Sequence, residues 1–175
     1  MVGILFNAVN RMQKNNSTTY AEGIPMANIV LVYASMTGNT EEIANAVAEG
    51  IQEAGESVVV KQVLDATAAE LAEYEAILLG AYTWGDGELP DEFLDFYDEL
   101  DQLDLTGKKA AVFGSCDSSY EHYGAAVDIL TAKLRERGCE IVSEGLKIEL
   151  APSDEERELC RAFGRQFVSA LQPAR

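Results

Sequence analysis

Three hydroxyl side chains lie close together in one short loop of this sequence, Ser35-Met36-Thr37-Gly38-Asn39-Thr40. The loop directly precedes a segment of helical period, and hydroxyl and backbone N–H groups at the start of a helix can bind an anion. It contains neither Lys nor Arg, and it lacks the Gly-Lys-Ser/Thr of nucleotide triphosphatases and the GxGxxG of dinucleotide sites. We therefore predict a site for one terminal phosphate. The alternative is an ordinary N-cap, in which Asn39 or Thr40 caps the helix.

The only tryptophan of the chain lies in a second loop, Ala81-Tyr82-Thr83-Trp84-Gly85-Asp86-Gly87-Glu88-Leu89-Pro90. The glycines that follow it permit unusual backbone angles, and such loops run over the protein surface, so Trp84 is not expected inside a strand. An isolated tryptophan could simply cover the edge of a sheet. Beside a phosphate loop in the same crevice, a planar ligand is the better explanation.

A third loop, Ser115-Cys116-Asp117-Ser118-Ser119-Tyr120-Glu121-His122-Tyr123-Gly124, offers a second aromatic residue and small polar residues. Two aromatics from different loops, Trp84 and Tyr120, suggest that a planar ring is held between them. His122 has no histidine or cysteine cluster near it in sequence, which favours a surface position over a metal site. Cys116 is predicted to be a small packing residue rather than a nucleophile, because no second histidine exists to activate it.

Apolar runs alternate with helical periods along the chain, and this alternation positions the three loops. Strands are predicted at 29–33, 57–60, 76–80, 110–114 and, broken at Gly145, 141–148. Helical periods follow at 43–51, 93–100, 127–134 and 159–171. We predict an α/β fold, a doubly wound five-stranded parallel sheet with helices on both faces. The loops then follow the first, third and fourth strands, at the carboxyl edge of the sheet where such folds bind ligands.

Net charge restricts the partners of this chain. Its 175 residues suit one domain, and 13 Lys plus Arg against 30 Asp plus Glu give a net charge of −17. This charge opposes nucleic acid and anionic membrane surfaces and favours a basic protein or a cation as partner. Much of it lies in one run without any Lys or Arg, which is either a docking surface or only a solvated helix face. The run contains Asp86, Glu88, Asp91, Glu92, Asp95, Asp98, Glu99, Asp101 and Asp104.

Cysteine usage and hydropathy indicate the compartment. The three cysteines are far apart and form no CxxC motif or disulfide framework, and no apolar run approaches the ~18 residues of a membrane helix. We therefore expect a cytoplasmic protein. Residues 1–25 show no sustained period and end at a Gly23-Ile24-Pro25 breaker. They are predicted to form a flexible N-terminal extension, dispensable for folding, before a single domain at 26–175.

The three loops, in this order, resemble those of the flavodoxin family, and specifically of its short-chain members. The first resembles the family's T/S-x-T-G-x-T phosphate loop, while Thr83-Trp84-Gly85-Asp86 and Asp117-Ser118-Ser119-Tyr120 resemble its two isoalloxazine loops. The resemblance covers 26–171 and implies a flavodoxin-like sheet of strand order 2-1-3-4-5 with non-covalently bound FMN. The position of FMN at the first and third strands is a property of the family, not a deduction from spacing.

The resemblance also implies roles for individual residues. Ser35, Thr37, Asn39 and Thr40 would hold the phosphate, Trp84 and Tyr120 would flank the ring, and Asp117 with nearby backbone would meet the pyrimidine edge. The peptide of Gly85 would turn to accept a hydrogen bond from the reduced ring. The full set of predicted cofactor contacts is Ser35, Met36, Thr37, Gly38, Asn39, Thr40, Thr83, Trp84, Gly85, Asp86, Ser115, Cys116, Asp117, Tyr120 and Tyr123.

The function implied is that of a monomeric, low-potential one-electron carrier that shuttles electrons between redox proteins, and not of an enzyme. Its partners would be basic reductases or oxidases that dock on the acidic face. The residues agree with this, because a site without cations does not stabilise negative charge on a reduced flavin. The alternative is an FMN-dependent NAD(P)H:quinone-type reductase on the same fold. Such an enzyme needs an open pocket over the ring, which Trp84 and Tyr120 would cover.

Overall fold

A parallel sheet forms the centre of the computed structural model, which describes residues 28–173. The sequence predictions for residues 1–25 lie outside the described residues. The strand order is β2-β1-β3-β4-β5, and all pairings in this sheet are parallel, as predicted. The strands are β1 (Ile29–Tyr33), β2 (Val58–Gln62), β3 (Ala76–Gly80), β4 (Lys109–Cys116), β5 (Glu140–Ile141) and β6 (Leu146–Glu149).

The fifth strand is broken, which confirms the interruption predicted at Gly145. Its two parts, β5 and β6, pair with successive stretches of β4. A Cβ atom on Gly145 would lie 2.4 Å from the Val127 Cγ1 atom, so a larger residue would not fit between the strand and the helix beside it. The glycine therefore lets the chain pass closely under that helix before pairing resumes.

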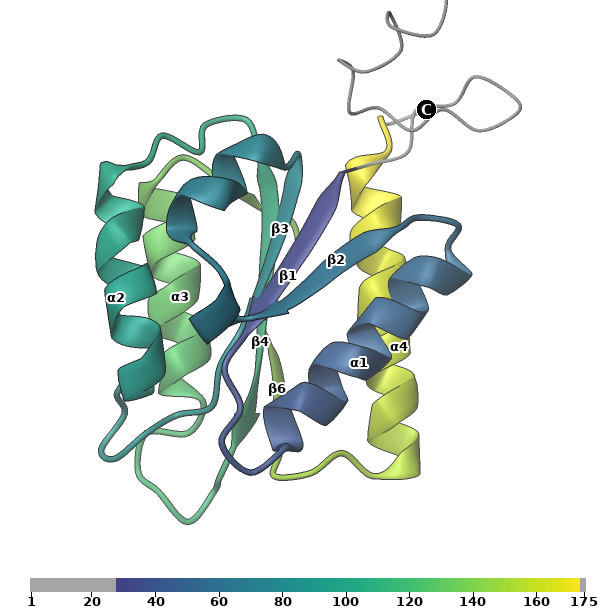
Figure 1. Ribbon diagram of the computed structural model, residues 1–175. Helices are drawn as coiled ribbons and strands as arrows, with labels where there is room; N and C mark the ends of the chain where they lie inside the picture. The colour runs from purple at the N-terminus through teal and green to yellow at the C-terminus, as the bar shows by residue number, and fades with distance from the viewer. Residues whose placement is uncertain (1–27, 174–175) are drawn as a thin grey trace, which may run out of the picture.

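Four α-helices cover the two faces of the sheet, as predicted. Helices α1 (Asn39–Glu53) and α4 (Asp154–Leu171) lie on one face, and α2 (Asp91–Glu99) and α3 (Ala125–Glu136) on the other (Figure 1). Three short 3₁₀ helices complete the described elements: η1 (Val63–Asp65), η2 (Ala68–Glu73) and η3 (Leu100–Gln102). The first two were not predicted, although Thr67 and Glu70 form a capping box at the start of η2.

The strand residues alternate between two cores, which explains why β1 and β3 are apolar throughout. In β1, Val30 and Val32 belong to the core on the α2/α3 side, whereas Ile29 and Leu31 belong to the core on the α1/α4 side. All five residues of β1 and all five of β3 are buried. A strand that is covered on both faces cannot show a polar side, so its sequence reads as a continuous apolar run.

Helices α1 and α4 approach each other closely at two glycines. A Cβ atom on Gly50 would lie 1.9 Å from the Arg161 carbonyl oxygen, and one on Gly164 would lie 2.2 Å from the Val47 carbonyl oxygen. The contact continues at the exposed edge as ion pairs between the helices, Arg157–Glu42, Arg161–Glu49 and Arg165–Glu53. Because α1 begins at the phosphate loop, this packing also fixes the position of that loop.

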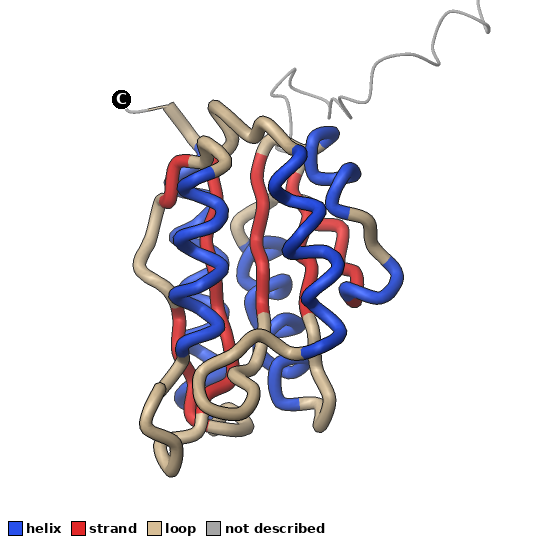
Figure 2. The backbone as a smooth tube through the Cα atoms, turned by 90° about the vertical axis from the view of Figure 1, so that its left-hand side faces the viewer, coloured by secondary structure: helices blue, strands red, loops and turns tan. Residues whose placement is uncertain are grey.

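The parallel arrangement brings the carboxyl ends of β1, β3 and β4 to the same edge of the sheet. The three loops singled out in the sequence leave the sheet at these ends, and the loops gather at one end of the molecule (Figure 2). No described helix is long and apolar enough to cross a membrane.

Candidate cofactor site

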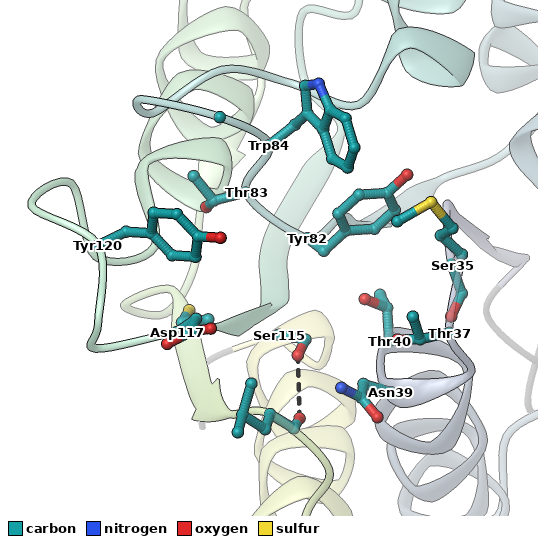
Figure 3. Close-up of a pocket in the computed structure, with 14 residues that line it drawn as sticks. Ser35, Thr37, Asn39, Thr40, Tyr82, Thr83, Trp84, Ser115, Asp117 and Tyr120 are labelled. Carbon is teal, nitrogen blue, oxygen red and sulfur yellow. Dashed lines mark hydrogen bonds between the residues drawn. The ribbon is translucent and has the colours of Figure 1, made fainter.

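A cavity of about 510 Å³ opens between the three loops (Figure 3). This volume is in the range of small-molecule and cofactor sites. Its walls come from segments that are far apart in sequence but share the carboxyl edge of the sheet. The lining residues are Ser35, Met36, Thr37, Asn39, Thr40, Tyr82, Thr83, Trp84, Gly85, Ser115, Cys116, Asp117, Tyr120 and Leu150.

Twelve of the fifteen residues predicted to contact the cofactor line this cavity. Gly38, Asp86 and Tyr123 lie in the same loops but outside the lining. Two lining residues were missed. Tyr82 could have been found, since it stands in the tryptophan loop directly before Thr83. Leu150 follows β6, where no motif, glycine or polar cluster marks the position.

The phosphate loop presents free backbone donors to the cavity. Gly38 is the N-cap of α1, with φ +92° and no side-chain cap, so the alternative in which Asn39 or Thr40 caps the helix is wrong. Within the described residues, the N–H groups of Met36, Thr37, Asn39 and Thr40 have no hydrogen-bond acceptor. The positive end of the α1 dipole lies at the same place. This arrangement is suited to an anion.

The Ser35 hydroxyl shapes this loop from inside. Its oxygen accepts hydrogen bonds from the N–H groups of Gly38 at 3.1 Å and Glu41 at 3.2 Å. These bonds fold the loop back onto the first turn of α1 and leave the other N–H groups of the loop without an acceptor among the described residues. Only the hydroxyl proton of Ser35 is then left for a ligand.

Thr40 carries the clearest sign that a polar ligand belongs here. It is 1% exposed and lines the cavity, yet its hydroxyl has no hydrogen-bond partner among the described residues. A buried polar group without a partner costs about 1–3 kcal/mol, so such groups are normally satisfied. No Lys or Arg lines the cavity. A phosphate would therefore meet neutral donors only, and the residues present fit it.

Aromatic side chains from the other two loops complete the lining of the cavity. Trp84 is 44% exposed and Tyr120 is 55% exposed, and they come from different loops (Figure 3). The Tyr82 ring packs edge-to-face against Trp84, with 6.4 Å between ring centroids. The Tyr82 hydroxyl donates to Glu92 Oε1 at 3.4 Å. Burial, and then the charge of Glu92, raise the pKa of Tyr82 to about 12, so the phenol stays neutral.

The third loop is held by its own polar side chains. The Asp117 carboxylate accepts hydrogen bonds from the hydroxyl and the backbone N–H of Ser119, and these bonds lower the pKa of Asp117. Glu149, on β6, accepts hydrogen bonds from the backbone N–H of Ser118 at 3.1 Å and from its hydroxyl at 2.9 Å. The loop is thus fastened to the neighbouring strand, and it carries a carboxylate that stays ionised at neutral pH.

Cys116 is a packing residue and His122 lies at the surface, as the sequence predicted. Cys116 is buried, and this burial raises the pKa of its thiol to about 11, which leaves it protonated and unreactive at neutral pH. His122 is exposed, and no group of metal-ligating residues occurs in the described part of the chain. Neither side chain therefore belongs to a metal-ligating group among the described residues.

The acidic run divides into two parts in the structure. Asp91 and Glu92 line a small neighbouring cavity together with Tyr82 and Trp84, so the run begins at the rim of the site. Five carboxylates of the run form neither an ion pair nor a side-chain hydrogen bond with any described residue: Asp86, Glu88, Asp91, Asp95 and Asp98. The later members are engaged within the fold, with Asp101 paired to Lys133 and Asp104 accepting from Thr106.

Comparison with known proteins gives one consistent family. Residues 31–164 match the family model described as flavodoxin. The chain is 49% identical over 144 residues to probable flavodoxin 2 of Bacillus subtilis (strain 168), which covers 82% of this chain and 95% of that protein. It is 40% identical over 134 residues to a flavodoxin of Maridesulfovibrio salexigens, which covers 75% of this chain and 92% of that protein.

Solved structures agree in fold. Oxidised flavodoxin 1 from Bacillus cereus superposes with a TM-score of 0.79 at 57% sequence identity, over 81% of this chain and 97% of that one. A short-chain flavodoxin associated with a bacterial microcompartment gives a TM-score of 0.80 at 34% identity, over 84% of this chain and all of that one. The strand order and the sequence motifs thus point to the same relatives.

Proposed function

The chain belongs to the flavodoxin family and is therefore a flavin-dependent electron carrier rather than an enzyme, and we propose that its cofactor is FMN, bound non-covalently in the cavity between the three loops. The unpartnered Thr40 hydroxyl is the observation that carries this proposal. Together with the free N–H groups beside it, it forms one compact set of neutral donors, enough for a single terminal phosphate. Trp84 and Tyr120 come from the other two loops that line the cavity, where a planar ring system fits.

Each wall of the cavity then has a role toward the cofactor. Ser35, Thr37, Asn39 and Thr40 would hold the phosphate. Trp84 and Tyr120 would flank the ring, and Asp117 with its neighbouring backbone would meet the pyrimidine edge. The Gly85 peptide would turn so that its carbonyl accepts a hydrogen bond from the reduced ring. Two observations support this last role: Gly85 has φ +52°, and only the Glu88 carboxylate lies within 4 Å of where its Cβ would be, at 3.6 Å.

A low potential follows from the charges around the cavity. FMN supplies one-electron chemistry when bound, and the protein sets how easily negative charge is added to it. No cation lines the site, while Asp117 in its wall stays ionised and the whole chain carries a net charge of −17. Adding an electron is therefore disfavoured, which makes the reduced protein a strong donor. The reductase alternative is not favoured, since the relatives are named flavodoxins.

Stepwise reduction of the FMN-loaded protein tests the function. We expect two resolved one-electron steps in the visible spectrum, because the site stabilises the anionic two-electron form poorly. We also expect no steady consumption of NAD(P)H in the presence of a quinone when no other protein is added. A single two-electron step together with rapid NAD(P)H turnover would show that the chain works as a reductase.

We further propose that basic redox proteins dock beside the cavity, on the exposed side of α2, which begins at the rim. The unpaired carboxylates Asp91, Asp95 and Asp98 supply the charge, and the exposed side chains of Met36 and Trp84 supply apolar surface next to it. Complementary charge speeds encounter and orients the partners, while apolar contact at the centre holds them. A monomeric carrier would leave this face open.

Neutralising Asp91, Asp95 and Asp98 to Asn should slow electron transfer to a basic cytochrome several-fold at low salt. The difference from the unchanged protein should vanish as salt rises, because exposed charges are screened over ~8 Å at physiological ionic strength. Stopped-flow rates over a salt series measure this. Glu92 is left unchanged, since it holds Tyr82.

The matched control changes Glu73, Glu75 and Glu140 to Gln. These exposed carboxylates lie at the opposite edge of the sheet, beside the starts of β3 and β5, so the net charge changes equally but far from the cavity. We expect a much smaller effect on the rate. Equal rates for both triple variants would mean that the acidic run is only a solvated helix face.

The three cysteines bear on the compartment. Cys116, Cys139 and Cys160 are free and buried, and burial raises the pKa of each thiol to about 11. Unpaired cysteines of this kind are typical of proteins in a reducing environment. They support the proposal that this carrier works in the cytoplasm.

A further inference from the structure

Leu150 has an unusual backbone conformation. Its φ is +52°, and it is the only residue other than glycine with a positive φ in the part of the chain that the structure describes. In this left-handed region the Cβ atom crowds the following carbonyl oxygen, so a leucine rarely adopts it. Such strain persists only where the surroundings fix it, and it is concentrated at functional sites.

The end of β4 fixes Leu150 on both sides. The Leu150 N–H donates to the Cys116 carbonyl at 2.8 Å, and the Leu150 carbonyl accepts from the Ser115 hydroxyl at 2.9 Å (Figure 3). Ser115 is itself buried. The preceding residue, Glu149, is held to Ser118. The left-handed conformation is therefore imposed by hydrogen bonds to two residues that line the cavity.

This conformation changes where the side chain lies. Along β6, Leu146 and Ile148 belong to the core on the α1/α4 side, and continued alternation would send Leu150 to the same core. Instead Leu150 is 47% exposed and lines the cavity with Ser115, Asp117 and Tyr120. The Leu150 side chain therefore lies in the wall of the cavity and not in the core. The hydrogen bonds to β4 hold this placement, but the exposed leucine buries no apolar surface in return.

We propose that Leu150 is a cofactor-contact residue, which covers FMN on the β6 side of the cavity and is kept in place by its strained backbone. The inference rests on the proposed function, because it takes FMN as the occupant of this cavity. Contact with the cofactor would remove the exposed surface of Leu150 from water. The free energy gained by burying this apolar surface on binding then offsets the energy of the strained Leu150 backbone.

Two substitutions separate the side chain from the backbone. Leu150→Ala removes the contact but keeps the unfavourable conformation, whereas Leu150→Gly removes the contact and relieves the strain. We expect both variants of the full chain to bind FMN about three- to tenfold more weakly than the unchanged protein, from the apolar surface lost. Without FMN, the Gly variant should melt about 2–4 °C above the Ala variant. Quenching of FMN fluorescence and thermal unfolding of the stripped protein measure the two effects.

Leu94→Ala is the control, because Leu94 is exposed to a similar degree, 43%, but lies on α2 outside the cavity. It should leave FMN affinity unchanged. Wild-type affinity in both Leu150 variants would overturn the inference and leave the proposed function standing. Weak binding by the Ala variant alone, in parallel with its lower melting temperature, would show a purely structural role. Failure of the unchanged protein to bind FMN would overturn the proposed function and this inference with it.

Discussion

Replacing Thr37 and Thr40 together by alanine should weaken FMN binding about 100-fold or more, because each hydrogen bond to a charged group contributes about 1.5–3 kcal/mol. Riboflavin, which lacks the phosphate, should bind the double variant as it binds the unchanged protein. The effect should be large because the cavity has no Lys or Arg to hold the phosphate in place of the lost hydroxyls. Fluorescence titration of the stripped protein with each flavin gives both dissociation constants.

Thr40→Ala alone should weaken FMN binding but stabilise the protein without cofactor. Its hydroxyl is buried and unpartnered, so removing it relieves an unsatisfied group at little cost in packing. We expect the free energy of unfolding of the stripped protein to rise by up to about 1 kcal/mol while FMN affinity falls. Opposite signs of this kind identify a group that is kept for binding rather than for stability.

Thr131→Ala is the control for these variants. Its hydroxyl donates to the Val127 carbonyl within α3 at 2.7 Å, outside the cavity, so it should change neither flavin's affinity. If the unchanged protein binds riboflavin as tightly as FMN, the loop does not contribute to binding through the phosphate. The proposal of a neutral phosphate site would then be wrong, whatever the variants do.

The sheet could be predicted from sequence because its signals are local. The buried strands β1 and β3 are apolar throughout because both of their faces are covered. The break in the fifth strand is marked by Gly145, at a position where a Cβ atom would collide with the Val127 side chain. The loops could be assigned to one edge because parallel strands bring their carboxyl ends together. Short 3₁₀ helices such as η1 lack a period long enough to detect.

Parts of the site depend on contacts that no local pattern contains. Leu150 lines the cavity only because β4 hydrogen-bonds its backbone into a left-handed conformation, more than thirty residues after Ser115 in sequence. The acidic run is uniform in sequence, yet Asp101 is paired with Lys133 on α3 while Asp91 is unpaired at the rim. Which carboxylates are structural is decided by the fold that surrounds them.

The close contact between α1 and α4 leads to the largest expected loss of stability. Gly50→Ala would place a Cβ atom 1.9 Å from the Arg161 carbonyl oxygen, and backbone cannot move aside as a flexible side chain can. Alanine is favoured over glycine in a helix by about 1 kcal/mol, but overpacking costs about 1–3 kcal/mol or more. At this distance we expect a net loss of about 2–3 kcal/mol and a melting temperature lower by about 5–10 °C.

Asn45→Ala supplies the control, since Asn45 lies on the exposed side of the same helix. This change also raises helix propensity, by somewhat less than Gly→Ala, and creates no contact with α4. It should leave the melting temperature unchanged or slightly raised. Because α1 begins at the phosphate loop, Gly50→Ala should also shift the helix away from α4 and weaken FMN binding, whereas Asn45→Ala should not. A Gly50→Ala protein as stable as the Asn45→Ala protein would show that the helices separate at no cost, and that the glycines do not fix the loop.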